Sequence, residues 1–319
     1  MEKLSFFKLP LIFVGMFVTI NFLKSCVTYI IVLFIIIDNF SFWPTIFEFM
    51  LNNLFHLILP SLLLFVVSSI AFYRMNIHII TVKNVGLLVI IVLLIMIFSF
   101  LFNRGNQLIY QLVYDKFFVN ITKADSWVFA LPMSAISRLV YFSLESLLIY
   151  YYIKIFGSWF NKSRQDFELT ANNSSKIHFT LFLAFFFFMF ITSTNCLTGL
   201  PSNLPFYNSY YVLFTVVPIF IYVIAFLLIT LITKNLFKRT FVVLQSDRII
   251  KSAVMTNLLI LIIDAVFAVI LFSTDYLPNK IGLLIVIYYP KAILIFAVIL
   301  SCLFVKRVTQ YYFAKPTNG

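Results

Sequence analysis

The sequence predicts an all-α membrane protein, a polytopic bundle of about eight transmembrane helices with short interfacial helices on the outer side. Three observations favour this fold class. Hydrophobic residues make up 63% of the 319 positions and charged residues only 11%, whereas charged residues make up about 25% of ordinary soluble domains. The mean hydropathy is +1.06. The apolar residues also come in runs of about 20, the length that crosses a ~30 Å hydrocarbon core.

Eight apolar segments qualify as spans when the chain is followed in order. The first is too long for the apolar region of a cleaved signal peptide and no cleavage site follows it, so we interpret it as an uncleaved span. The connections are short, and we therefore expect one integral membrane domain covering 1–319. The predicted spans are 11–37, 54–73, 85–102, 129–153, 177–193, 210–232, 253–273 and 281–305.

The distribution of Lys and Arg predicts the orientation of the chain. When the connections are assigned alternately from a cytoplasmic N-terminus, the inner segments carry 16 basic residues and the outer segments carry 4. This excess agrees with the positive-inside rule and favours two cytoplasmic termini. It also accounts for the net charge of +12 without nucleic acid, because the basic residues flank the spans. The small size and short connections favour a bacterial inner (cytoplasmic) membrane.

Several connections have features of their own. Polar residues recur at helical spacing at Thr45, Glu48, Asn52 and His56, and again at Gln107, Gln111 and Asp115, which predicts two helices lying in the outer interface. The uncharged loop 194–209 is interpreted as a turn-rich connection, with a lid as the alternative. The segment 234–252 is typical of a basic stretch that favours an anionic lipid surface.

Five ionisable residues lie within the predicted spans, where a charge facing lipid costs roughly 2.5–3.5 kcal/mol. We therefore expect them to face the bundle interior, a partner or water. Asp264 and Lys291 each lie ten residues from the outer end of their span, about 15 Å deep, which predicts an ion pair. Lys24 and Glu145 lie at a similar depth in their spans, which favours a second contact between these two residues. The five residues are Lys24, Arg138, Glu145, Asp264 and Lys291.

Arg138 is the residue from which we infer a ligand. Three cations and two carboxylates leave one cation over, and a guanidinium remains protonated and binds carboxylate or phosphate through two nitrogens. On the fourth span, Ser134, Arg138, Tyr141 and Glu145 share one face. The sequence therefore favours binding or transport of an anionic or amphiphilic small molecule, such as a lipid headgroup. The residues predicted to bind it are Lys24, Arg138, Glu145, Asp264 and Lys291.

Two other function classes stay open. Asp38 and Glu48 follow the first span at the outer face, where a carboxylate can act as a general base for group transfer from a lipid-linked donor. Alternatively, the membrane charges pair with helices of another protein, as in a non-catalytic assembly or regulatory subunit. No nucleotide-binding, zinc-protease or nucleophile motif occurs. The three cysteines and three histidines are widely spaced, so no metal site or cofactor is predicted.

Overall fold

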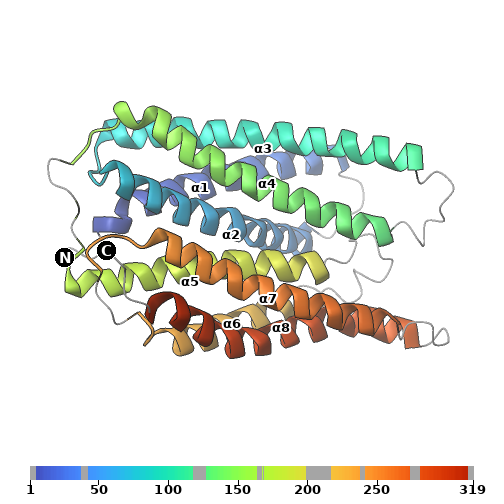
Figure 1. Ribbon diagram of the computed structural model, residues 1–319. Helices are drawn as coiled ribbons and strands as arrows, with labels where there is room; N and C mark the ends of the chain where they lie inside the picture. The colour runs from blue at the N-terminus through green and yellow to red at the C-terminus, as the bar shows by residue number, and fades with distance from the viewer. Residues whose placement is uncertain are drawn as a thin grey trace. The chain divides into compact units, whose positions relative to one another are not determined.

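The apolar segments of the sequence form long helices in the computed structural model of the protein (Figure 1). The structure describes residues 5–36, 42–117, 127–163, 167, 169–198, 217–237, 241–273 and 281–314. Within these ranges every regular element is helical. The helices are α1 (Ser5–Ile36), α2 (Phe42–Met75), α3 (Val82–Phe117), α4 (Trp127–Ile155), the short 3-10 helix η2 (Phe156–Ser158), α5 (Ala171–Thr198), α6 (Val217–Thr233), α7 (Ser246–Ser273) and α8 (Ile281–Ala314).

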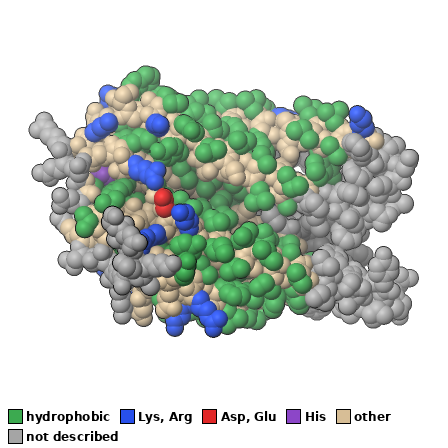
Figure 2. Space-filling model, in the orientation of Figure 1, with side chains coloured by type: hydrophobic (Ala, Val, Ile, Leu, Met, Phe, Trp, Pro, Cys, Tyr) green, Lys and Arg blue, Asp and Glu red, His purple; other side chains and the backbone are tan. Residues whose placement is uncertain are grey.

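Seven of these helices are long and apolar enough to cross a membrane, and α6 is an apolar helix of 17 residues. A helix satisfies its own backbone hydrogen bonds, which lipid cannot do. Figure 2 shows hydrophobic side chains over much of the visible helical surface, as expected for surface in contact with acyl chains. The protein is therefore a multi-pass integral membrane protein, and the predicted all-α polytopic bundle is confirmed.

The two segments predicted as interfacial helices are helical, but they extend longer helices instead of standing alone. The stripe containing Glu48 lies within α2, and the stripe containing Gln107 and Gln111 lies within α3. Gly105 is the weakest helix former where the apolar part of α3 meets the polar stripe. One glycine costs a helix only about 1 kcal/mol. The helices therefore continue to lengths of about 51 and 54 Å, at ~1.5 Å for each of their 34 and 36 residues.

The chain divides into two compact units, which are described separately. Unit 1 is Met1–Ile109 with Val140–Phe167, and unit 2 is Tyr110–Leu139 with Glu168–Gly319. Unit 1 thus contains α1, α2 and most of α3 and α4, and unit 2 contains α5 to α8. The prediction of a single membrane domain stays a prediction.

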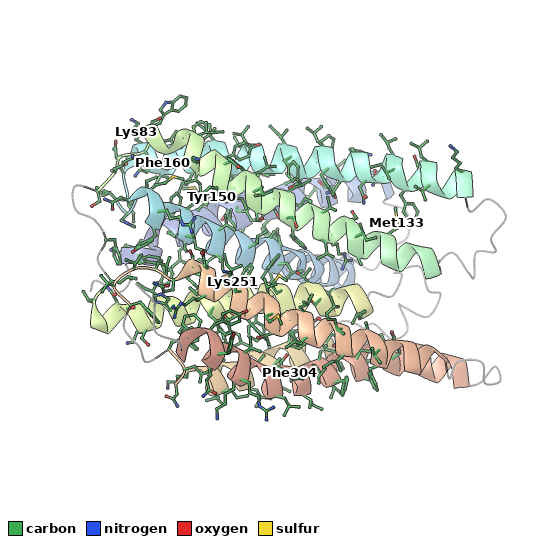
Figure 3. All side chains as sticks on the ribbon, in the orientation of Figure 1. Lys83, Met133, Tyr150, Phe160, Lys251 and Phe304 are labelled. Atoms are coloured by element: carbon green, nitrogen blue, oxygen red, sulfur yellow. The ribbon has the colours of Figure 1, made fainter. Side chains whose placement is uncertain are left out.

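In unit 1, one end of the helices is joined by hydrogen bonds around Asn84, which is fully buried. Its side-chain amide donates to the carbonyls of Ile79 (2.8 Å) and Asn161 (3.0 Å), and its Oδ1 accepts the backbone N–H of Asn161 (2.7 Å). The end of α2, the start of α3 and the segment after α4 therefore meet here. Lys83 and Phe160 lie at this end, which we call the basic end of unit 1 (Figure 3).

The turn between α2 and α3 is set by local chemistry. Asn76 has a φ of 56°, a left-handed conformation that asparagine tolerates better than most residues. The amides of Asn76 and Ile77 donate to the carbonyls of Tyr73 (3.2 Å) and Phe72 (2.9 Å), which is a Schellman C-cap. The Thr81 hydroxyl then accepts the amide of Asn84 (3.1 Å), which caps the start of α3.

The apolar core of unit 1 lies next to the Asn84 cluster. Phe13 and Phe17 of α1 pack against α2 and α3, and the last residues of α4 complete the cluster. Beyond Phe17, no residue of α1 up to Thr28 is buried. The buried members are Leu9, Phe13, Phe17, Leu64, Ala71, Phe72, Ile77, Leu87, Leu88, Ile91, Val92, Ile95, Ile149, Ile153 and Phe160.

Unit 2 has an equivalent cluster at its own basic end, where α5 and α7 begin and α6 and α8 end. The Ser174 hydroxyl donates to the carbonyl of Phe241 (2.9 Å) and accepts its amide (3.0 Å). His178 Nε2 accepts the amide of Gln245 (3.0 Å), so the proton is on Nδ1 and donates to the carbonyl of Ser174 (2.7 Å). Phe313 of α8 contacts the Phe241 ring at 6.1 Å.

Helix α5 is central in unit 2, where it contacts α6, α7 and α8 (Figure 1). Phe182, Phe186 and Phe190 follow each other at intervals of four on one face, and all three are fully buried. These three phenylalanines therefore lie in the core of this unit.

Candidate binding site in the second unit

Asp264 is the most unusual side chain in the interior of unit 2. It lies on α7 and is only 1% exposed. Neither of its carboxylate oxygens has a hydrogen-bond partner among the described residues. Burying a carboxylate without a partner carries a large desolvation cost. Such a group in a membrane helix is by default a candidate functional residue.

The predicted hydrogen-bonded ion pair between Asp264 and Lys291 is not formed, because the register of α7 and α8 differs from the expected one. The rings of Phe267 and Phe296 are 4.5 Å apart, and Arg248 donates to the carbonyl of Tyr312 (3.3 Å). Counted along the two antiparallel helices from these contacts, Asp264 lies level with the α8 segment from Phe296 to Ile299. Lys291 lies one to two turns away, roughly 8–12 Å along the axis.

Lys291 is nevertheless inside the same unit. It is 8% exposed, on α8, and directly follows Pro290, which has no amide hydrogen to donate to the carbonyl one turn earlier. Tyr289 is also buried. The expectation that Asp264 and Lys291 face the interior therefore agrees with their burial, although they do not bond to each other.

A layer of hydroxyl and amide groups lies at the level of Asp264. Asn257, two turns earlier on α7, donates to the carbonyls of Ala253 (2.9 Å) and Phe186 (3.4 Å), which fixes the register of α7 against α5. Asp264 consequently lies level with the segment of α5 around Thr194. The Thr194 and Tyr222 hydroxyls are 2.8 Å apart, so α6 joins the same layer.

Further polar atoms extend this layer. The Tyr222 hydroxyl donates to Asn195 Oδ1 at 3.2 Å, while Asn257 Oδ1 is buried without a hydrogen-bond partner among the described residues. Tyr222 and Thr194 were missed in the sequence, because a lone tyrosine or threonine in an apolar run is usually a packing residue. Only the register between helices places them level with the carboxylate.

In unit 1, Glu145 is the buried carboxylate, at 1% exposure on α4. Its Oε1 lies 3.2 Å from the Tyr141 hydroxyl, which confirms that these two residues share a face. Its Oε2 has no hydrogen-bond partner among the described residues. The predicted contact with Lys24 is therefore not a hydrogen bond. Lys24 is exposed, because α1 leaves the core of unit 1 after Phe17.

The structure adds none of the remaining predicted residues to these sites. Arg138 is exposed on α4. Asp38 lies outside the described residues, and Glu48 lies in α2 with its side chain outside them. Of the segment 194–209, interpreted as a turn-rich loop with a lid as the alternative, residues 194–198 belong to α5 and residues 199–209 lie outside the described residues. Within the part of the chain that the structure describes, no three His, Cys, Asp or Glu side chains are placed to hold a metal ion.

Comparison with known proteins adds no family. No protein-family model matches the chain, and no curated protein or solved structure matches it.

Proposed function

We propose that the protein binds or transports an amphiphilic small molecule within unit 2, with Asp264 as the ligand-binding group. The observation that carries this proposal is the buried carboxylate of Asp264, whose two oxygens have no hydrogen-bond partner among the described residues. A ligand that donates hydrogen bonds, or carries an ammonium group, would supply the missing partner. A partner of this kind offsets the desolvation cost that the free site carries.

The surroundings of Asp264 favour an amphiphile. Apolar side chains such as Phe267 and Ile293 adjoin the site, and the hydroxyl groups of Thr194 and Tyr222 lie at its level. Membrane transport sites commonly lie near the bilayer midplane, beside broken helices. Pro290 interrupts the backbone hydrogen bonding inside α8, because proline has no amide hydrogen. Lys291 would contact an anionic portion of the same ligand, which retains the anionic character inferred from the sequence.

Native mass spectrometry of the gently purified protein tests this proposal. We expect a small-molecule adduct on the wild type that is lost in Asp264→Asn, because the amide keeps the shape but not the charge. Glu145→Gln is the matched control, since it removes the buried carboxylate of unit 1, and it should keep the adduct. A wild type with no small molecule, or an adduct retained in Asp264→Asn, would contradict the proposal.

An assembly subunit is the second candidate, and the exposure of two intramembrane cations favours it. Lys24 on α1 and Arg138 on α4 are both exposed among apolar neighbours. Acidic groups on helices of a partner protein would pair with them. The same spectra test this role: a protein subunit that is lost in both Lys24→Ala and Arg138→Ala, with no small molecule present, would support it over ligand binding.

The lipid-linked transferase remains a prediction from the sequence, with Asp38→Asn as its test. The bacterial inner membrane and the two cytoplasmic termini also remain proposals. They are supported by the basic residues that flank the ends of the helices in both units, including Lys83 and Lys251 (Figure 3).

A further inference from the structure

A chain of three side-chain oxygens links α3 to α4 in unit 1. Ser99 Oγ lies 2.9 Å from the carbonyl of Ile95 and 2.8 Å from the Tyr141 hydroxyl. The Tyr141 hydroxyl lies in turn 3.2 Å from Glu145 Oε1. The Tyr141 ring is surrounded by Phe98 and Phe102, with ring centroids 6.0 and 5.2 Å away, so the chain runs through an apolar environment.

These three contacts need three hydrogens, and the two hydroxyls supply only two. A carbonyl only accepts, so the hydrogen of Ser99 is used for Ile95. When Glu145 is ionised, the Tyr141 hydroxyl donates to its Oε1, and the contact between Ser99 and Tyr141 is then a hydrogen bond only if the Ser99 hydroxyl turns away from Ile95. When Glu145 is protonated, it donates to the Tyr141 hydroxyl, which leaves the hydrogen of Tyr141 for Ser99 Oγ. The protonated carboxyl makes all three bonds, and the ionised carboxylate makes two.

We propose that Glu145, Tyr141 and Ser99 form a proton-binding site, in which the carboxyl of Glu145 takes up and releases a proton. On release, the Tyr141 hydroxyl turns from Ser99 to Glu145 Oε1, and the Ser99 hydroxyl turns from the Ile95 carbonyl to Tyr141. One O–H bond of the carboxyl breaks, its electron pair stays on the carboxylate, and the proton passes to water. Two hydroxyl rotations thus accommodate the change without moving a helix.

No fixed cation among the described residues competes with the proton. Among the described residues, Glu145 Oε2 has no hydrogen-bond partner and Oε1 has only Tyr141, which is also the one titratable group of the described part of α4 that contacts it. From α3 the facing group is the uncharged Ser99. The side chains of Glu48 and His56 on α2 lie outside the described residues. The charged residues of the described helices in this unit that do not bond Glu145 are Lys8, Lys24, Arg74, Lys83, Arg104 and Lys154.

This inference does not depend on ligand binding at Asp264, because the two carboxylates belong to different units. It adds a second kind of ligand, the proton, to the proposed function. A protein with a ligand site in one unit and a proton site in the other has the parts needed for proton-linked transport, but the proton site stands on its own geometry.

Carbodiimide labelling of the full-length protein tests the proposal, because dicyclohexylcarbodiimide reacts with protonated carboxyls in apolar surroundings. We expect an adduct on the wild type that peptide mapping assigns to Glu145. Its yield should fall roughly tenfold for each pH unit above the titration midpoint, as the protonated fraction does. Mapping on the wild type keeps the test valid even if a Glu145 variant fails to fold.

Infrared difference spectra across the same pH series supply a second readout. Because the buried Asp264 carboxyl can give the same band, the comparison is made in Asp264→Asn. A protonated-carboxyl band should be present in that variant and absent when Glu145→Gln is added to it. Ser99→Ala removes the acceptor of the Tyr141 hydrogen and should lower labelling at a given pH about fivefold, the effect of one hydrogen bond. Ser146→Ala is the matched control and should leave labelling unchanged, because this half-buried serine of α4 donates to the carbonyl of Ser143 in its own helix (2.8 Å).

Two outcomes would overturn the proton site. One is an adduct on Asp264 alone, with no adduct on the peptide containing Glu145. The other is a carboxyl band in Asp264→Asn that persists when Glu145→Gln is added. Neither result bears on the mass-spectrometric test of the ligand site, so the two proposals fail separately.

Discussion

The two units resemble each other at their basic ends and differ in how they hold a buried carboxylate. At each basic end, side chains bond to backbone groups far along the chain, through Asn84 in unit 1 and through Ser174 and His178 in unit 2. In the interior, Glu145 has a hydroxyl neighbour, whereas Asp264 has no hydrogen-bond partner among the described residues. The basic ends therefore serve the fold, and Asp264 carries the stronger argument for a ligand.

The largest expected effect tests the basic end of unit 1. Asn84→Ala removes three hydrogen bonds that join α2, α3 and the segment after α4, and should destabilise the protein by about 3 kcal/mol. Thermal unfolding in detergent would measure the loss. Asn161→Ala is the matched control: its side chain makes one exposed bond to Thr81, at 3.2 Å, and should cost much less. Equal losses in both variants would show that the Asn84 cluster does not hold the unit together.

At Asp264 we expect a change of intermediate size, and here the substitution should raise the stability instead of lowering it. Asp264→Leu replaces an unpartnered carboxylate by an apolar group of similar size, and should stabilise the ligand-free protein by about 2 kcal/mol. Asp264→Asn should give a smaller gain, because the amide still needs hydrogen bonds. The same thermal measurement applies, and it should be made beside the ligand assay. A clear loss of stability in Asp264→Leu would indicate that the carboxylate has a structural partner.

The smallest expected effect tests the basic end of unit 2. Ser174→Ala removes both hydrogen bonds to Phe241 but leaves those of His178, and should cost about 1 kcal/mol. Ser301→Ala is the control, since that buried serine bonds only to Ala297 of its own helix at 2.8 Å. A loss in Ser174→Ala as large as that in Asn84→Ala would make the two basic ends energetically equivalent.

The helices could be predicted from the sequence because lipid imposes a length and a hydropathy on each span. The limits of the helices could not, since the polar stripes beyond Phe102 do not interrupt the backbone of α3. The shared face of Tyr141 and Glu145 follows from helical spacing within one helix, and that prediction is confirmed. Spacing within one helix is fixed by the sequence at short range, and this is why it could be inferred.

Contacts between helices were harder to predict from the sequence. The Asp264–Lys291 pair was inferred from equal distances to the connecting loop, and that assumption is wrong once Phe267 is placed opposite Phe296. The bonds of Asn84 and His178 cross 77 and 67 residues of sequence and leave no periodic signal. Of the candidate ligand site, only Asp264 and Lys291 were visible in the sequence.

The length of α3 has a consequence for the membrane itself. About 54 Å of helix, at ~1.5 Å per residue, exceeds a ~30 Å hydrocarbon core by far. Beyond Arg104, Leu108 and Leu112 are 61% and 69% exposed, so this part of α3 presents apolar side chains at the surface. Tilting α3 would draw these side chains into the acyl chains. The acyl-chain length of the surrounding lipids is thus a physical variable that acts on α3, and through α3 on the helices packed against it.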